Sequence, residues 1–226
     1  MWSRDDLRMT EIILMSAPEV AAVPVQECGE PLMDVRRHGA LLVDERKWHD
    51  SAGAFAHLRE GVLDRLLKAQ AELPAGMRLL FVEGYRPPYL QRRYFDEYAA
   101  RLREDHPEWT AGQLRTAASR YVSPPQIAPH SAGAAVDVTL ADDDGRELDM
   151  GTRMNATPEE SAGACYTQAD NISPVARSHR ETLSTALTQA GLVNYPTEWW
   201  HWSYGDRYWA LKTGAPVAQY GPKELG

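Results

Sequence analysis

The sequence predicts a mixed fold of helices and strands, because helix-like and strand-like hydrophobic patterns alternate along the chain. Five apolar positions repeat at helical spacing: Leu58, Val62, Leu63, Leu66 and Leu67. Residues 77–82 instead form a short, nearly continuous apolar run, which is typical of a strand covered on both faces. Pro74 and Gly76 separate the two patterns, so we expect an amphipathic helix followed by a buried strand.

The same alternation continues downstream. Further helices are predicted after Pro87 and Pro88, after the capping box of Thr110 with Gln113, and after Ser173 and Pro174. Further strands are predicted at 136–140 and in the aromatic-rich stretch 197–204, since aromatic residues favour strands. The tail after Gly205 is aromatic but shows no pattern.

The segment 148–171 is rich in small and polar residues and predicts a long irregular loop. Loops of this length inside a compact domain are usually functional, so we expect this one to cover a substrate. The acidic run before it, 142–145, predicts a solvated hairpin tip rather than a calcium loop, because the remaining EF-hand ligand positions are missing.

Length and composition indicate an ordinary globular protein. A chain of 226 residues can bury a sizeable core, and we expect one domain over 1–226. Prolines punctuate the segment 1–50, so we expect extended segments and turns there rather than helices, and we expect this segment to wrap the rest. The net charge of -8 and the lack of a clustered Lys/Arg run argue against nucleic acid or an anionic membrane as a partner. The oligomeric state stays open.

The cellular location is expected to be the cytoplasm. The first apolar run, 12–15, is too short for a signal peptide or a membrane span. The two cysteines, Cys28 and Cys165, lie far apart without CxxC spacing, which predicts free thiols in a reducing compartment.

Three places hold polar residues in apolar or small surroundings: Arg86, His130 with Asp137, and Glu198 with His201. Each place also has a structural interpretation. Arg86 could tie loops together, His130 could cap a proline-rich loop, and Asp137 could accept hydrogen bonds from backbone amides at a strand start. Taken alone, the stretch around His201 predicts an aromatic core strand with a satisfied histidine.

The combination favours a metal site. Two histidines and one carboxylate, here His130, Asp137 and His201, are a common catalytic zinc set that leaves a fourth position for water. Glu198 would then serve as general base and afterwards as acid, and Arg86 would face the oxygen that becomes negative. On a regular strand the side chains at 198 and 201 would point to opposite faces, so one shared site requires a strand end, a bend or a bulge.

These residues stand in motifs that resemble those of the M15 metallopeptidases, specifically the D-alanyl-D-alanine dipeptidases of the VanX type. The likeness lies in His130-x-x-Gly133-x-Ala135-x-Asp137, in Glu198-Trp199-Trp200-His201 and in the turn Glu83-Gly84-Tyr85-Arg86-Pro87. Two shorter segments, Met150-Gly151-Thr152-Arg153 and Asn171-Ile172-Ser173, extend it over roughly residues 35 to 205.

The resemblance implies an α+β fold with a small central antiparallel sheet flanked by helices, DD-peptidase/hedgehog-like. It implies one zinc ion per chain on His130, Asp137 and His201, with Glu198 as general base and Arg86 as oxyanion stabiliser. It also implies a small closed cavity for a dipeptide with free termini, and cleavage of D-Ala-D-Ala.

We expect three residues to contact this substrate: Asn155, Ser131 and Trp200. Two positions depart from the family pattern. Ala128 stands where the family usually has Ser, and Asn155 stands where it usually has an Asp that helps to bind the substrate ammonium. Loss of such a charge-assisted hydrogen bond costs about 1.5 to 3 kcal/mol, which would weaken recognition of a free amine by about one or two decades.

Two alternatives stay open. Within enzymes, the alternative is a zinc amidase that acts on a non-standard amide in a biosynthetic or resistance pathway. Outside enzymes, it is a non-catalytic zinc-binding module. Glu198 argues against the module, because a purely structural zinc site needs no base and usually fills its fourth position with protein.

Overall fold

A five-stranded sheet in the order β2-β4-β5-β7-β6 forms the centre of the computed structural model, which describes residues 12–44, 53–119 and 121–224. Its strands are β2 (Leu42–Val43), β4 (Arg78–Glu83), β5 (Ala135–Ala141), β7 (His201–Ser203) and β6 (Val193–Asn194). Only the short β2 runs parallel to its neighbour β4; the other pairs are antiparallel. The expected antiparallel sheet is therefore confirmed except at this edge.

A separate two-stranded sheet pairs β1 (Leu32–Asp34) with β3 (His57–Arg59). The helices are α2 (Pro18–Ala22), α3 (Glu60–Ala71), α4 (Pro88–Asp105), α5 (Ala111–Ala118), α6 (Pro174–Gln189) and α7 (Arg207–Thr213). Short 3₁₀ turns occur at Val35–His38, Ala54–Ala56 and His130–Ala132. None of the described helices is long and apolar enough to cross a membrane.

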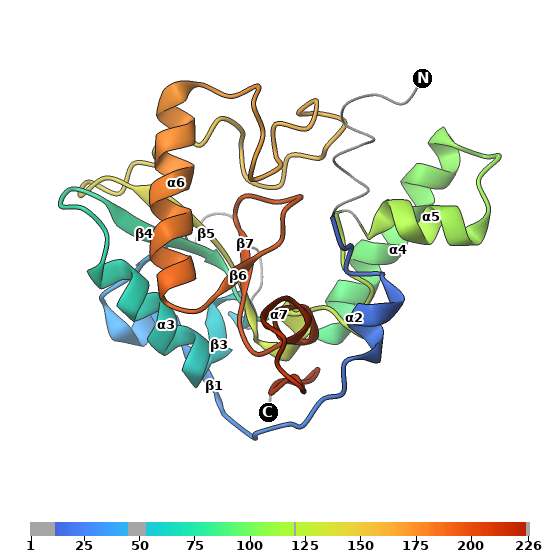
Figure 1. Cartoon of the computed structure of the whole chain (residues 1–226), viewed down its shortest axis with the longest axis horizontal. Helices are drawn as coiled ribbons and strands as arrows, with labels where there is room; N and C mark the ends of the chain where they lie inside the picture. The colour runs from blue at the N-terminus through green and yellow to red at the C-terminus, as the bar shows by residue number, and fades with distance from the viewer. Residues whose placement is uncertain (1–11, 45–52, 120, 225–226) are drawn as a thin grey trace.

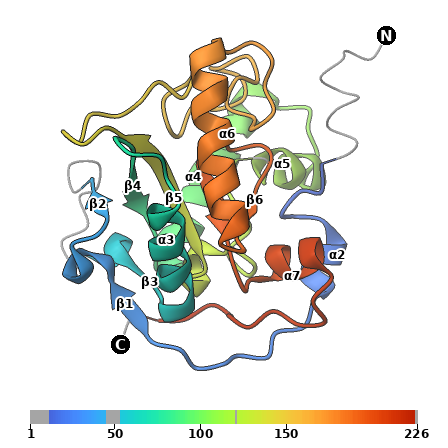
Figure 2. The same cartoon turned by 60° about the vertical axis from the view of Figure 1, so that its left-hand side comes forward.

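Helices α3 and α6 cover one face of the sheet, and α4 and α5 lie to the side of it (Figures 1 and 2). The main core forms under α3 and α6, where Leu66 and Leu187 pack with Val136, Val138 and Leu140 of β5. Alternation along a strand sends the odd-numbered residues of β5, including Asp137, to the other face. This second face carries the polar site.

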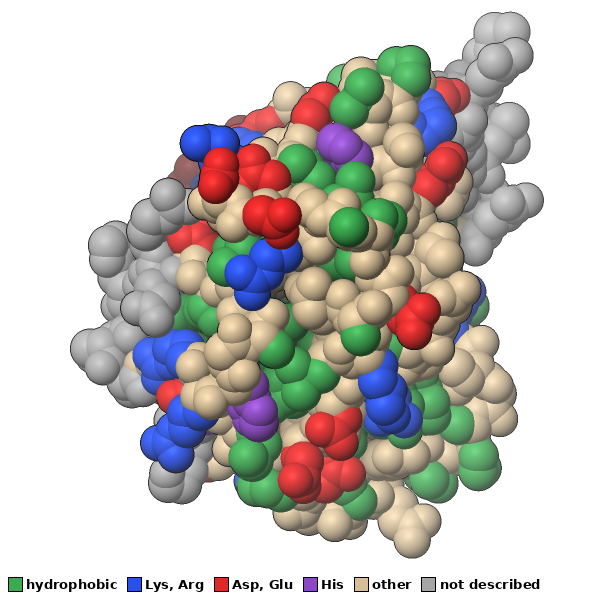
Figure 3. All heavy atoms as spheres, turned by 90° about the vertical axis from the view of Figure 1, so that its left-hand side faces the viewer, with side chains coloured by type: hydrophobic (Ala, Val, Ile, Leu, Met, Phe, Trp, Pro, Cys, Tyr) green, Lys and Arg blue, Asp and Glu red, His purple; other side chains and the backbone are tan. Residues whose placement is uncertain are grey.

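The outer surface carries acidic and basic side chains interspersed with apolar ones, as the face shown in Figure 3 illustrates. No field of one charge sign dominates that face. Both cysteines are free, as expected, and the structure places Cys28 at the surface and Cys165 in the interior.

The structure corrects four details of the expected elements. Leu58 belongs to β3, and the helix begins only at Glu60. The stretch 197–200 is a turn, and the strand begins at His201. The tail forms α7, whose N-cap Asp206 accepts from the amides of residues 208 and 209. A short helix, α2, occurs in the N-terminal segment, of which residues 1–11 and 45–50 lie outside the described residues.

The loop 148–171 is irregular, as expected, and a buried arginine on α6 holds it. Arg180 donates to the carbonyls of Met150 (2.7 Å), Ala164 (2.8 Å) and Tyr166 (2.8 Å). Because these carbonyls come from both ends of the loop, one side chain ties the loop to the helix.

We predict that Arg180→Met lowers the free energy of unfolding by about 3 kcal/mol, because it leaves buried carbonyls without a donor. Urea denaturation measures the change. Arg103→Met is the matched control, since Arg103 is exposed on α4. Equal stabilities of the two variants would show that Arg180 does not hold the loop.

Candidate active site

The antiparallel strands β4, β5 and β7 bring three polar residues into one row on the polar face of the sheet. In the register of β4, β5 and β7, Glu83 lies opposite Asp137, and Asp137 lies opposite His201. Residues directly opposite each other in an antiparallel pair project from the same face. The row therefore places two carboxylates and an imidazole side by side, all of them buried.

A β-bulge in β4 aims Glu83 into this row. The pairing of Phe81 with Val138 is followed directly by that of Glu83 with Asp137, so Val82 has no opposite partner in β5. A bulge of this kind inserts one residue and reverses the side on which the next residues project. Without it, Glu83 would point into the apolar core beside Phe81.

His130 reaches the row from the 3₁₀ turn that leads into β5. Its Nδ1 donates to the carbonyl oxygen of Gly84 at 2.6 Å, which leaves Nε2 as an acceptor directed at the other ligands. The turn ends at Gly133, whose φ of 66° lies in the left-handed region. The left-handed backbone therefore favours glycine here, and a Cβ atom would in addition force the end of the Leu32 side chain to shift.

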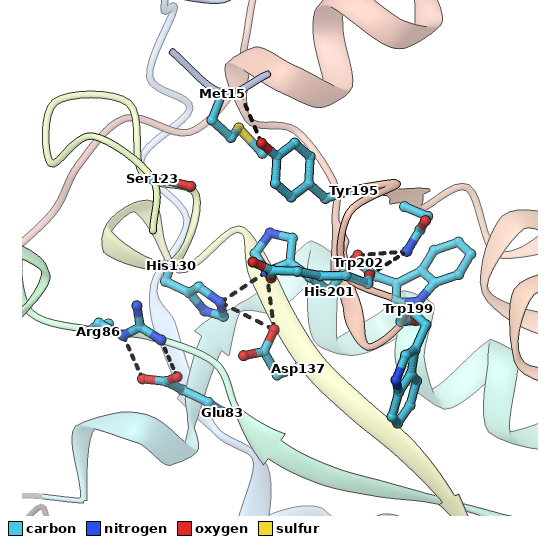
Figure 4. Close-up of polar contacts among 12 residues, drawn as sticks. Met15, Glu83, Arg86, Ser123, His130, Asp137, Tyr195, Trp199, His201 and Trp202 are labelled. Carbon is cyan, nitrogen blue, oxygen red and sulfur yellow. Dashed lines mark hydrogen bonds and ion pairs between the residues drawn. The ribbon is translucent and has the colours of Figure 1, made fainter. Parts of the chain in front are cut away.

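Three candidate metal-ligand atoms converge in this site (Figure 4). His130 Nε2 lies 3.3 Å from Asp137 Oδ1 and 3.2 Å from His201 Nδ1, and His201 Nδ1 lies 3.0 Å from Asp137 Oδ1. Tetrahedral zinc with bonds of about 2.0–2.2 Å separates nitrogen and oxygen ligands by roughly 3.3 Å. The spacing and the donor types therefore fit one zinc ion.

A tight turn brings Glu198 to the same site. The amide of Glu198 donates to the carbonyl of Tyr195 (2.9 Å), and the amide of His201 donates back to the carbonyl of Glu198 (3.2 Å). Consequently Glu198 Oε2 lies 3.9 Å from His201 Nδ1. The alternation conflict of a regular strand does not arise, because Glu198 precedes the strand.

Two tryptophans of the segment 197–202 stabilise this turn by hydrogen bonds. Trp199 donates its indole N–H to Thr152 Oγ1 at 2.9 Å, and Trp202 donates its own to the carbonyl of Trp199 at 3.1 Å. Asn194 donates to the carbonyls of both Glu198 and His201. The position of Glu198 is thus determined by buried hydrogen bonds on both sides.

The electrostatics of the two acids differ. Burial raises the pKa of Glu198 well above its ordinary value, and the charges of Asp137 and Glu83 add to this, whereas Arg86 opposes it. Burial also disfavours ionised Asp137, but the charge and hydrogen bonds of His130 and His201 outweigh it and lower the pKa of Asp137. Asp137 therefore suits a permanently ionised ligand, and Glu198 suits a group that exchanges protons.

Arg86 is fixed by two buried partners. Its Nε donates to Glu83 Oε1 at 2.8 Å, its Nη2 pairs with the other Glu83 oxygen, and its Nη1 donates to Gln91 Oε1 at 2.8 Å. Gln91 in turn donates to the carbonyl of Ser123 at 2.7 Å. Burial opposes the charge of Arg86, but the adjacent Glu83 raises its pKa, so the guanidinium stays protonated.

These groups open into a cavity of about 310 Å³. All five predicted catalytic and metal-binding residues line it: Arg86, His130, Asp137, Glu198 and His201. Ala128 and Asn155, the two departures from the family pattern, line it as well. Asn155 has a φ of 60°, and Tyr121 donates to its carbonyl at 2.8 Å.

Ser131 and Trp200 are not among the lining residues. Ser131 is fully buried and donates to the carbonyl of Arg86 at 2.9 Å, so it supports the arginine turn. Trp200 is 1% exposed and packs in the main core against Trp199. In this geometry both act behind the cavity wall rather than at its surface.

Sequence reasoning missed several residues of the site, namely Glu83, Gln91, Tyr94, Tyr121 and Tyr195. A polar residue on the buried side of α4 was the available signal for Gln91. Glu83 lies inside the arginine motif, but its role depends on the bulge.

Comparisons with known proteins agree with this geometry. A family model described as D-ala-D-ala dipeptidase matches residues 52–216. A D-alanyl-D-alanine dipeptidase of Synechocystis sp. is 31% identical over 224 residues, which cover 84% of this chain and 87% of that protein. A D-alanyl-D-alanine dipeptidase of Escherichia coli is 36% identical over 72 residues, 32% of this chain and 35% of that protein.

Among solved structures, the LdcB LD-carboxypeptidase superposes with a TM-score of 0.46 at 17% identity, over 85% of this chain and 76% of that chain. The family assignment depends on the sequence matches, which cover most of this chain. The chain is therefore a peptidase that belongs to the D-Ala-D-Ala dipeptidase family of M15 metallopeptidases.

Proposed function

We propose that this chain is a zinc-dependent dipeptidase that hydrolyses D-Ala-D-Ala or a related D- or modified dipeptide. One observation supports this most strongly. Three buried ligand atoms within 4.8 Å of one another share a cavity with Glu198, which is not needed as a ligand. A non-catalytic zinc module would have no use for this buried acid. The cytoplasmic location expected from the sequence stays a prediction.

The zinc ion and Glu198 would have separate roles in hydrolysis. A bound zinc ion would supply a Lewis acid that acidifies water and polarises the scissile carbonyl. Glu198 accepts a proton from the attacking water and then passes it to the leaving amine, so that a C–O bond replaces the C–N bond. Its raised pKa suits this exchange, because a carboxylate that binds a proton more tightly is a stronger base towards water.

Arg86 stabilises the negative charge that develops on the carbonyl oxygen. Such stabilisation depends on donors that are already in place, and Glu83 and Gln91 hold the guanidinium at the cavity wall. His130 is oriented in the same way by the carbonyl of Gly84. The reaction therefore requires little rearrangement of the described side chains.

We predict that Glu198→Gln lowers kcat by a factor of about 100 to 10,000, because the amide cannot accept the proton. The variant should still bind one zinc ion per chain, which mass spectrometry under native conditions measures. Glu181→Gln, an exposed change on α6, is the control. Near-normal turnover by the Glu198 variant would rule out this residue as the base.

Zinc should also stabilise the fold, since a ligand that binds only the native state raises the free energy of unfolding. We predict that a chelator abolishes hydrolysis and lowers the Tm, and that added zinc restores both. Asp137→Asn should remove the zinc-dependent rise in Tm, whereas Asp142→Asn, at the hairpin tip, should keep it. If zinc changed the Tm of both variants equally, the metal would bind elsewhere.

Asn155 allows a test of the amine pocket. We predict that Asn155→Asp lowers the KM for free D-Ala-D-Ala about tenfold, because a carboxylate adds a charge-assisted hydrogen bond to the substrate ammonium. Asp tolerates the left-handed backbone of this position about as well as Asn. Steady-state kinetics at neutral pH give the answer. An unchanged KM would mean that residue 155 does not contact the amine.

A further inference from the structure

Two segments from opposite ends of the described chain, 24–30 and 218–223, run side by side (Figure 2). Backbone hydrogen bonds join them, for example from the amide of Ala218 to the carbonyl of Pro24 at 2.9 Å. Both segments lie outside residues 52–216, the part of the chain that the family model matches. We call the pair of segments the terminal belt.

A buried arginine, Arg59, connects the terminal belt with the turn that carries His130. Its side chain is fully buried and makes five hydrogen bonds, as many as it has N–H donors. Four of them go to the belt, where the Glu27 carboxylate accepts two and backbone carbonyls accept the others. The fifth runs from Nε to the carbonyl of Ala132 at 2.8 Å. One guanidinium thus sets the distance between the belt and the turn.

This turn is held at three successive carbonyls. Those of Ser131, Ala132 and Gly133 all accept hydrogen bonds from outside the turn. The donors are, in the same order, the amide of Lys223 (2.9 Å), Nε of Arg59 (2.8 Å) and the amide of Arg59 (2.9 Å). The three residues directly follow the first proposed metal ligand in the chain. A displacement of that ligand's backbone would therefore break contacts to the arginine or to the belt.

The same end of the belt also contacts the turn that carries Arg86. Tyr85 is fully buried and donates its hydroxyl to the carbonyl of Lys223 at 2.6 Å. The amide of Arg86 donates to the carbonyl of His130 at 3.1 Å, and Ser131 Oγ donates to the carbonyl of Arg86 at 2.9 Å. Hydrogen bonds thus connect Lys223 with the backbones of the proposed oxyanion donor and of one proposed metal ligand.

The place of these contacts favours a role in positioning. Arg59, Tyr85 and Lys223 do not line the active-site cavity. They contact the backbone directly beside His130 and Arg86 instead. Alteration of the groups that orient a metal ligand from behind typically changes metal affinity or activity by about 10- to 100-fold. Contacts that served stability alone would have no such effect.

We infer that Arg59 and the terminal belt position His130 for zinc, so that zinc binding and the ordering of the belt favour each other. The coupling is reciprocal, because two sites linked through one conformation change each other's equilibria by the same factor. The inference rests on the zinc site proposed above. It assigns Arg59 as a positioning residue that acts through the turn.

Amide hydrogen exchange of the unaltered protein, measured by NMR without zinc and with saturating zinc, tests this coupling. We predict that zinc slows the exchange of the Gly221 and Lys223 amides about tenfold, since the first donates within the belt and the second to the turn beside His130. The amide of Ala215 is the control, because it donates to Ala210 in the same tail but outside the belt. Its exchange rate should stay the same.

A variant tests the coupling from the other side. We predict that Arg59→Met raises the Kd for zinc about tenfold, as competition with a chromophoric chelator measures, while circular dichroism checks the fold. Arg177→Met is the matched control, because Arg177 also donates to two backbone carbonyls but does not line the active-site cavity. Its Kd for zinc should equal that of the unaltered protein.

The outcomes separate the inference from the proposed function. If zinc raised the Tm but left the exchange of both belt amides unchanged, the inference would be wrong and the proposed zinc site would stand. An unchanged Kd in a folded Arg59 variant would also overturn the inference. If that variant did not fold, the exchange rates of the unaltered protein would decide. A protein that bound no zinc would refute both the inference and the proposed function.

Discussion

The pairing of β4, β5 and β7 is the constraint on which the site depends. Their register places Glu83, Asp137 and His201 in one row on the face that α3 and α6 leave free. The other three predicted catalytic or metal-binding side chains reach this row from the end of one of the three strands. Arg86 follows β4, His130 precedes β5, and Glu198 precedes β7. A shift of one residue in the pairing of β4 or of β7 with β5 would turn Glu83 or His201 towards the apolar core.

Burial of so many charges is costly unless each has a partner. In this site most of the buried charges have such a partner. Glu83 neutralises Arg86, and His130 and His201 stabilise ionised Asp137. Glu198 is the exception, because the only basic group paired with it among the described residues is the His201 ring, 3.9 Å away, and burial raises the pKa of Glu198. The acid with the least compensation is thus the one proposed to move a proton.

Helix α4 connects the chemistry with the choice of substrate. Its first turn carries Gln91, which holds Arg86, and the same helix face continues through Tyr94, Tyr98 and Arg101, which line the active-site cavity. A change in the tilt of α4 would therefore alter both the position of the oxyanion donor and the shape of the active-site cavity. The α4–α5 hairpin has its own small core, centred on Phe95 and Leu114, which stabilises this helix away from the sheet.

Much of the site was predictable from the sequence because it depends on residue types at fixed spacings. His130, Asp137, His201, Glu198 and Arg86 all line one cavity, as predicted, and the helices after Pro87, Thr110 and Ser173 are confirmed. Helix α7 could have been predicted as well, since Asp206 is a favourable N-cap. Because the aromatic residues after Gly205 show no regular spacing, no element was predicted there.

Other features could not be predicted, because they arise only from tertiary pairing. The bulge that aims Glu83 exists only relative to β5, and the turn that aims Glu198 is held by Asn194 and Thr152. Strand propensity of the tryptophans gave the wrong structure for residues 197–200, since buried hydrogen bonds outweigh it. A further cavity, of about 230 Å³, likewise requires α4 and the segment 157–160 to be adjacent.

Anomalous X-ray scattering at the zinc absorption edge, from crystals of the zinc-loaded protein, would locate the metal relative to Glu198. We expect one strong peak per chain, within bonding distance of His130 Nε2, Asp137 Oδ1 and His201 Nδ1, with Glu198 beside it but not bonded to it. A peak at another place in the chain, or a fully occupied zinc ion with Glu198 as its fourth protein ligand, would refute the proposed catalytic metal site.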